Sequence, residues 1–197
     1  MKQKITGIVL SGGKSSRMGS DKGLLVLHGK PLIQYSIEVL KELCSEIIIC
    51  ANNPAYYRFG FPVIKDVYPD LGPIGGIYTG LLNSNSDSNL VLSCDMPFIN
   101  FQALAYLLSR NNKSLVSIPI HDQNMIEPLC ALYSKAILPQ LTKQIRNQDL
   151  KLMNLLKTVD VNWVKMDSGF EFFHPNLFFN VNDQDSLDIA ETILRQI

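Results

Sequence analysis

The chain has 197 residues, and its 46% hydrophobic content is sufficient for one well-buried core. Its 18 basic residues balance its 18 acidic residues, which argues against nucleic acid or an anionic membrane surface as a partner. No stretch approaches the roughly 18 apolar residues of a membrane span, and the short apolar run after Lys4 lacks the features of a signal peptide. We therefore expect one cytoplasmic domain over residues 1–197, with its four scattered cysteines reduced.

Short apolar runs alternate along the chain with longer segments of helical periodicity, the pattern of β-α units around a mainly parallel sheet. The expected strands are 5–10, 46–51, 62–65, 89–94, 114–120, 128–133 and 161–166. The expected helices are 31–43, 76–82, 101–109 (capped by Asn100), 134–145, 150–157 and a last helix that begins near 183–185 and docks on the sheet. Polar loops are expected over 11–21, 67–75 and 121–127. In open α/β sheets ligands bind beyond the carboxyl ends of the strands, so polar residues that directly follow strands are the first site candidates.

The loop after the first expected strand reads LSGGKSSRMGSDKG from Leu10 to Gly23 and combines glycines with three cations. A Walker A loop does not fit, because the position that its first glycine needs is Ile8, inside the strand. A Rossmann glycine pattern does not fit either, since the glycines lack its spacing. Glycines allow close approach of the backbone to a ligand, and cations neutralise negative charge. The composition therefore favours a phosphate-binding loop over a solvated surface loop.

Short motifs follow one another from this loop to the last expected helix. They are Leu10-Ser11-Gly12-Gly13, Arg17-Met18-Gly19, Asp21-Lys22-Gly23-Leu24-Leu25, Gly29-Lys30-Pro31-Leu32, Asp66 with Leu71-Gly72-Pro73-Ile74-Gly75-Gly76, Ser93-Cys94-Asp95-Met96-Pro97-Phe98, Pro128-Leu129-Cys130-Ala131-Leu132-Tyr133 and Phe179-Asn180-Val181-Asn182-Asp183. Together they resemble the motifs of the nucleotidyltransferases, and in detail those of the molybdenum cofactor guanylyltransferase family. The resemblance implies an α/β fold of three α/β/α layers, Rossmann-like, with a mostly parallel mixed central sheet.

The resemblance also implies an activity: transfer of GMP from GTP to the terminal phosphate of molybdenum-molybdopterin, with Mg²⁺ as cofactor and pyrophosphate as second product. GTP and molybdenum-molybdopterin would be the small-molecule partners, and molybdoenzymes or their chaperones the protein partners. Two alternatives stay open. The chain could be a nucleotidyltransferase of other specificity, such as a molybdopterin cytidylyltransferase or a sugar- or alcohol-phosphate nucleotidyltransferase. It could also be a non-catalytic module that binds GTP or the cofactor.

The resemblance assigns roles residue by residue. The implied nucleotide- and cofactor-binding residues are Leu10, Ser11, Gly12, Gly13, Lys22, Asp66, Gly72 and Asp95. The implied catalytic residues are Arg17, Lys22, Asp95, Asn180 and Asn182. Lys22 would neutralise triphosphate charge as a point charge and Arg17 as a forked donor.

The resemblance makes Asp95 the expected metal ligand. Its position after a strongly apolar strand is compatible with this role, since Mg²⁺ favours one or two protein carboxylates together with substrate phosphates. Its residue type would equally suit the cap of the following turn. Asn180 and Asn182 would share one side of an extended segment, or Asn182 could cap the last helix.

Some residues of the expected nucleotide site have an alternative interpretation. Asp66 and Gly72 could be ordinary turn residues rather than ligand contacts. Cys50-Ala51-Asn52 stands where the best-known member of the family has Asn-Ala-Asn, so either Asn52 supplies the missing amide or the contact is absent. The three histidines do not cluster in the sequence and are expected at the surface or behind the site.

Overall fold

The computed structural model describes residues 4–12, 21–122 and 124–196. Its strands are β1 (Ile5–Leu10), β2 (Val26–Leu27), β3 (Lys30–Pro31), β4 (Glu46–Cys50), β5 (Val63–Ile64), β6 (Ser88–Ser93), β7 (Val116–His121), β8 (Met125–Ile126), β9 (Cys130–Ser134) and β10 (Val161–Lys165). Its α-helices are α1 (Leu32–Leu43), α2 (Pro73–Asn83), α3 (Phe101–Ser109), α4 (Leu138–Arg146), α5 (Leu152–Leu156) and α6 (Gln184–Leu194). Short 3-10 helices cover Lys22–Leu24, Pro54–Phe59 and Lys135–Ile137.

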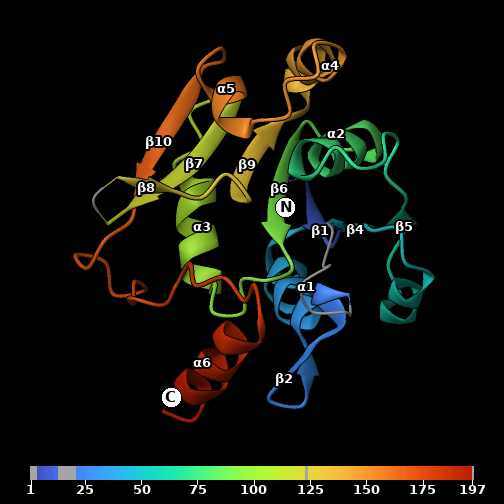
Figure 1. Cartoon of the computed structure of the whole chain (residues 1–197). Helices are drawn as coiled ribbons and strands as arrows, with labels where there is room; N and C mark the ends of the chain where they lie inside the picture. Colours follow the sequence, from blue (N-terminus) through green and yellow to red (C-terminus); the bar gives the residue numbers. More distant parts are fainter. Residues whose placement is uncertain (1–3, 13–20, 123, 197) are drawn as a thin grey trace.

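An 8-stranded sheet runs through the molecule in the order β10-β7-β9-β6-β1-β4-β5, with β8 paired to β7 (Figure 1). Strand β1 pairs in parallel with both β4 and β6, and β7 pairs in parallel with β10. Strand β9 is antiparallel to β6 and to β7. The carboxyl ends of β1, β4, β6, β7 and β10 therefore lie along one edge of the sheet. The predicted mostly parallel mixed sheet is confirmed.

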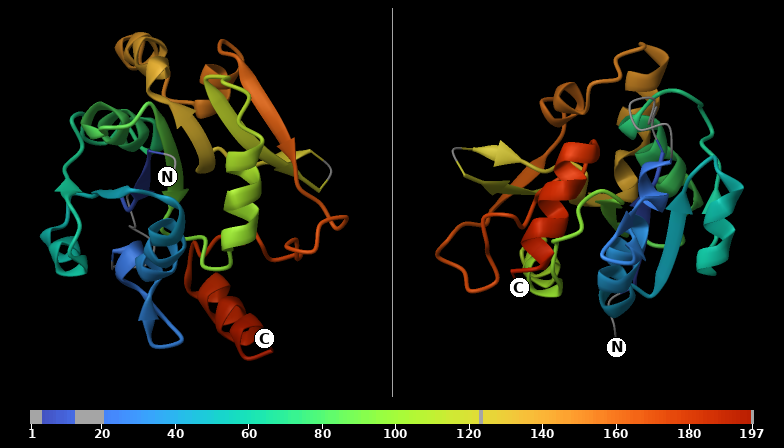
Figure 2. Two further views of the ribbon diagram at one scale, coloured as in Figure 1. Left: turned by 180° about the vertical axis from the view of Figure 1, so that it is seen from behind. Right: turned by 60° about the horizontal axis from the view of Figure 1, so that its bottom comes forward.

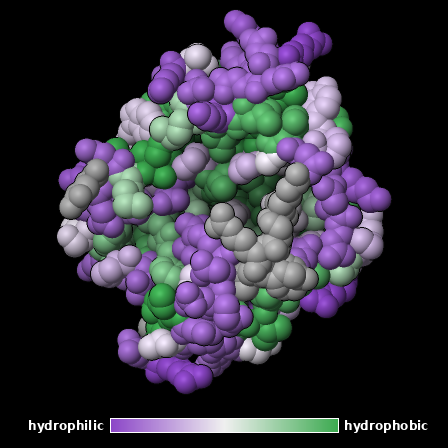
Figure 3. All heavy atoms as spheres, in the orientation of Figure 1, coloured by the Kyte–Doolittle hydropathy of each residue, from purple (hydrophilic) through white to green (hydrophobic). Residues whose placement is uncertain are grey.

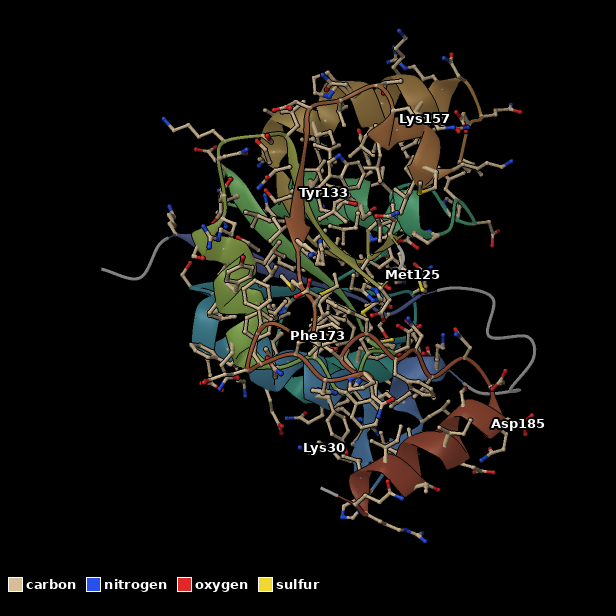
Figure 4. The ribbon with its side chains drawn as sticks, turned by 90° about the vertical axis from the view of Figure 1, so that its left-hand side faces the viewer. Lys30, Met125, Tyr133, Lys157, Phe173 and Asp185 are labelled. Carbon is tan, nitrogen blue, oxygen red and sulfur yellow. The ribbon has the colours of Figure 1, made fainter. Side chains whose placement is uncertain are left out.

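Helices cover both faces of this sheet, which confirms the three layers. Residues of β1 alternate between the faces: Ile5 and Val9 pack with α1 and α3, whereas Ile8 and Leu10 pack with α2, α4 and α5. All six residues of β1 are buried, as expected for a strand that is covered on both faces. Figure 2 shows the two helical layers from behind, and the side chains between them are drawn in Figure 4.

The last helix packs elsewhere than expected. Leu187 and Ala190 of α6 lie in a small separate core with Leu27 of the β2–β3 hairpin and Leu32 at the start of α1. The expectation that this helix docks on the sheet is wrong: α6 lies beside the hairpin, at the bottom of Figure 1. Its apolar face has the predicted helical period, but periodicity alone does not identify the surface that this face covers.

Several element boundaries also differ from the prediction. Helix α2 begins at Pro73 and not at Gly76, because Gly72 adopts a left-handed conformation (φ 64°) and Pro73 has the fixed φ of a first helical turn. The β2–β3 hairpin was not expected; His28 and Gly29 both have positive φ at its turn. The expected loop over 121–127 contains β8, and the expected helix over 134–145 divides into a 3-10 turn and α4.

On the face drawn in Figure 3, hydrophilic side chains cover the top and much of the margin and also extend across the lower centre, and hydrophobic side chains show between them. Among the described residues, no helix combines the length and the apolar character needed to cross a membrane.

Candidate functional site

Three of the predicted site residues converge at the carboxyl edge of the sheet. Lys22 begins a short 3-10 helix, Asp95 lies two residues beyond β6, and Asn182 lies two residues before α6. The Nζ atom of Lys22 lies 2.5 Å from Oδ2 of Asp95 and 2.6 Å from Oδ1 of Asn182. The fold thus brings together residues from three distant parts of the chain, as the motif pattern predicts.

Asp95 is buried, with 8% of its surface exposed. Two backbone hydrogen bonds fix the segment around Asp95. The N atom of the preceding residue, Cys94, donates to the carbonyl of Leu10 at 3.0 Å, and Val181 N donates to the carbonyl of Asp95 at 2.9 Å. Within the described part of the chain, Oδ1 of Asp95 is buried and has no hydrogen-bond partner. A buried carboxylate oxygen without a partner is costly unless a ligand or cation satisfies it, so the carboxylate is suited to a metal ion.

Asn180 does not join this group in the same way. Its Nδ2 atom donates to the carbonyl of Phe178 at 3.1 Å, within its own segment. Val181, which separates the two asparagines, is fully buried. The backbone amide of Asn182 donates to Ser186 Oγ at 2.8 Å, while the N-cap of α6 is Asp183. The capping alternative for Asn182 is therefore not what the helix uses.

The loop that is predicted to bind phosphate is described only at its two ends. Gly13 and Arg17, both expected to contact the nucleotide, lie outside the described residues. Ser11 is buried; its backbone N donates to the carbonyl of Cys50 at 3.0 Å and its Oγ to the hydroxyl of Tyr56. The Ser11 side chain thus faces the interior, which leaves the backbone of this segment to approach a ligand.

A cavity of about 330 Å³ opens beside this segment, at the carboxyl ends of β1 and β4. Four predicted binding residues line it, namely Leu10, Gly12, Asp66 and Gly72, and Cys50 and Asn52 line it too. An added Cβ on Gly12 would lie 3.9 Å from Asp66 Oδ2, so the Gly12 backbone and the Asp66 carboxylate are neighbours in the cavity wall. The sequence pattern and the cavity therefore agree on this part of the site.

The structure shows which residue offers an amide at this cavity. Asn52 Nδ2 donates to Oδ2 of Asp66 and Asn52 Oδ1 accepts from the backbone N of Asp66, both at 3.2 Å. Cys50 is 2% exposed, and burial, with a smaller contribution from Asp66, raises its thiol pKa to about 12. Asn52, and not Cys50, is thus the polar group at this position. Burial raises the pKa of Asp66, and the hydrogen bond from Asn52 partly offsets this.

A second cavity of about 330 Å³ lies at the carboxyl ends of β7 and β10 and was not predicted from the sequence. His121, Asn124, Lys165, Asp167 and Ser168 contribute to its lining. The available signal was the position of these residues directly after two parallel strands.

His121 connects this second cavity to the region of Asp95. Its Nε2 atom lies 3.0 Å from Glu127 Oε1 and its Nδ1 atom 3.2 Å from Asp122 Oδ2, and its ring stacks on Phe178 at 4.4 Å. Burial raises the pKa of Glu127; the hydrogen bond with His121 lowers it, and the nearby Asp95 charge adds to the increase. His121 is 8% exposed, so it does not lie at the open surface; it contributes to the wall of the second cavity.

The fold and these groups define a class: α/β proteins that bind a nucleotide at the carboxyl edge of a mostly parallel sheet and act on its phosphates. A family model for the MobA-like NTP transferase domain matches residues 7–162. The chain belongs to this family.

Two relatives and one solved structure cover nearly the whole chain. A Flavobacterium johnsoniae protein, described as a probable molybdenum cofactor guanylyltransferase, is 34% identical over 94% of this chain and 96% of its own length. The molybdenum cofactor guanylyltransferase of Vibrio parahaemolyticus is 35% identical, over 91% of each chain. The crystal structure of molybdopterin-guanine dinucleotide biosynthesis protein A from Archaeoglobus fulgidus has a TM-score of 0.83 and 26% identity, and the match covers 98% of this chain and 100% of that one.

Proposed function

We propose that this protein transfers GMP from GTP to the terminal phosphate of molybdenum-molybdopterin, and releases pyrophosphate. The observation that carries the proposal is the convergence of Lys22, Asp95 and Asn182 beside a cavity lined by the predicted nucleotide-binding residues. The names of relatives that match more than 90% of the chain support the choice of guanylyl transfer.

Asp95 is the residue that would hold Mg²⁺, the cofactor we propose. Its Oδ2 atom faces Lys22, whereas its buried Oδ1 atom has no partner among the described residues. One carboxylate with additional phosphate oxygens is an ordinary ligand set for Mg²⁺. When bound, the ion neutralises charge on the phosphates.

Lys22 supplies the second positive charge at this point. Its side chain is 22% exposed, so the ammonium is partly shielded from water and attracts phosphate charge more strongly than a surface lysine does. Arg17, which lies outside the described residues, would add a forked donor. An acceptor phosphate is already ionised at neutral pH and needs no general base, so catalysis rests on positioning and charge neutralisation.

The second cavity is our candidate for the acceptor site. Transfer between two substrates requires both to reach the same phosphate, and Asp95 follows β6, which lies between the strands that end at the two cavities. Ser168→Tyr would fill the second cavity and should raise KM for molybdenum-molybdopterin without changing KM for GTP. Ser109→Tyr, at the end of α3, is the matched control. Equal effects of the two variants would contradict the assignment.

The function itself is tested with purified protein, Mg²⁺, molybdenum-molybdopterin and each nucleoside triphosphate in turn, with pyrophosphate as readout. We expect release with GTP. A preference for CTP would favour the cytidylyltransferase alternative. If none of the triphosphates leads to pyrophosphate release, a non-catalytic binding module would be favoured. We also propose a cytoplasmic location, with molybdoenzymes or their chaperones as recipients of the product.

A further inference from the structure

The hydroxyl of Tyr56 connects the two described ends of the phosphate-binding loop. Ser11, the first residue after β1, donates its Oγ hydrogen to the Tyr56 oxygen. The Tyr56 hydroxyl in turn donates to Oδ1 of Asp21, the residue directly before Lys22. One hydroxyl thus accepts from one end of the loop and donates to the other end, which are ten positions apart in the numbering.

The short helix Pro54–Phe59 holds this hydroxyl in place. Tyr56 is fully buried, and the N-cap Asn53 accepts a hydrogen bond from Ala55 N at 2.9 Å. Nδ2 of Asn53 also donates to Oδ2 of Asp21 at 3.1 Å, so the same helix binds both carboxylate oxygens of Asp21. Burial is the main cause of a raised pKa for Tyr56; its hydroxyl therefore keeps its proton and remains a donor to Asp21.

Close packing at Gly23, the residue directly after Lys22, further restricts the position of the Lys22 backbone. A Cβ atom on Gly23 would overlap Ser11 Oγ and the Tyr56 hydroxyl, and would lie 3.2 Å from Cys94 Sγ. The backbone N atoms of Leu24 and Leu25 donate to the carbonyls of Asp21 and Lys22 at 3.0 and 3.2 Å. Lys22 is thus held between two residues that both contact Tyr56.

We infer that Tyr56 is a positioning residue for nucleotidyl transfer: by tying Ser11 to Asp21, it holds the Lys22 ammonium against Asp95 and Asn182. The inference rests on the proposed role of Lys22 in transfer. Tyr56 acts through Asp21 and Gly23 and lies in the core on the α1 face of the sheet. The competing explanation is that the hydroxyl only satisfies buried polar groups and contributes to stability.

Tyr56→Phe separates these explanations, because it removes the hydroxyl and keeps the ring. The matched control is Tyr133→Phe, since Tyr133 is equally buried and its hydroxyl donates to the carbonyl of Pro128 at 2.8 Å; Tyr133 lies within the core in Figure 4. We expect Tyr56→Phe to lower kcat/KM for GTP about tenfold, as a displaced catalytic group does, and Tyr133→Phe to change it by less than about twofold. Equal losses in the two variants would overturn the inference.

The coupling to Lys22 is tested by adding Tyr56→Phe to Lys22→Ala in a single-turnover assay. If Tyr56 acts through Lys22, the second change should lower the remaining rate by less than about twofold. A full tenfold loss in that background would mean that Tyr56 acts independently of Lys22, and would contradict the inference.

A readout without substrate distinguishes this inference from the proposed function. Amide hydrogen exchange at Ser11, Leu24 and Leu25 should be faster in Tyr56→Phe than in the wild type, and unchanged in Tyr133→Phe. Unchanged exchange in Tyr56→Phe would overturn the inference whatever the kinetics. A harmless Lys22→Ala together with faster exchange would instead contradict the proposed role of Lys22 and leave the restraint by Tyr56 established.

Discussion

The two carboxylate oxygens of Asp95 have different surroundings. Oδ2 binds the ammonium of Lys22 at 2.5 Å, and Oδ1 is the buried atom that has no partner within the described residues. The side chains of Lys22 and Asp95 are 22% and 11% exposed, so the pair is less screened by water than an ion pair at the surface. The Lys22 ammonium also donates a hydrogen bond to Oδ1 of Asn182, a neutral acceptor. Under the proposed function, Oδ1 is the atom that would bind Mg²⁺.

Asp95→Asn should lower kcat at least about a hundredfold and change KM for GTP much less, because the carboxylate acts on charge in the transition state while the cavity residues bind the nucleotide. Steady-state kinetics over a range of Mg²⁺ concentrations measures both parameters. Asp160→Asn, at an exposed position, is the control. Near-normal kcat in Asp95→Asn would rule out the metal assignment.

Asp66 predicts a pH dependence of stability. Burial raises its pKa in the folded protein above 3.8, so the folded chain takes up this proton at a higher pH than the unfolded chain. The ionised carboxylate therefore lowers the free energy of unfolding at neutral pH, and this penalty is relieved as the pH falls through the folded pKa. Asp66→Asn should be more stable than the wild type at pH 7, by a margin that shrinks toward pH 3.8. Denaturant unfolding between these values measures the margin; a margin that grows on acidification would refute the account.

At the scale of elements, glycines bring α2 close to β1 at the edge of the cavity lined by Leu10 and Asp66. A Cβ atom on Gly80 would lie 2.5 Å and 2.9 Å from side-chain carbons of Ile8, whereas on Gly76 it would lie 3.1 Å from Leu10 Cδ2. Glycine is unfavourable inside a helix by about 1 kcal/mol relative to alanine, so its presence here reflects close packing. The approach of α2 brings Gly72, at its start, to the cavity wall.

Gly80→Ala should therefore destabilise the protein by about 1–3 kcal/mol despite the better helix propensity of alanine, because the added methyl group overpacks Ile8. Gly76→Ala should cost less, since its neighbour is the end of a flexible leucine side chain. Urea unfolding of the two variants measures the order. An increase in the free energy of unfolding of Gly80→Ala would contradict this prediction, because it would show that α2 accommodates the methyl group without loss of stability.

Sequence periodicity predicts the strands and most helices of this protein, because long buried runs such as β1 and amphipathic segments such as α1 follow from local patterns. It does not predict the partner of α6, since the surface that Leu187 covers is formed by the distant Leu27 and Leu32. It also misses the two-residue strands β2 and β3, which are too short for a periodic signal. Among the site residues, Lys22, Asp95 and Asn182 follow from motifs, whereas Tyr56 resembles an ordinary core aromatic until its hydrogen bonds are seen.

At the scale of the whole molecule, the strand order gives the site its arrangement. The cavity with Asp66 lies where β1 and β4 end, Asp95 follows the neighbouring strand β6, and the second cavity lies where β7 and β10 end. Strand β9 is antiparallel between β6 and β7, so it separates the two cavities without adding a carboxyl end at this edge. Under the proposed function, GTP and the acceptor would thus bind on either side of the Asp95 carboxylate.

The most direct test of the central claim is the fate of the α-phosphate of GTP. The purified protein is incubated with Mg²⁺, molybdenum-molybdopterin and GTP labelled at the α-phosphate, and the products are separated. The account predicts that the label moves into a dinucleotide with the acceptor, that pyrophosphate is released unlabelled, and that Asp95→Asn abolishes the transfer. Label that stays in GTP, or that moves only when the labelled triphosphate is CTP, would contradict the account.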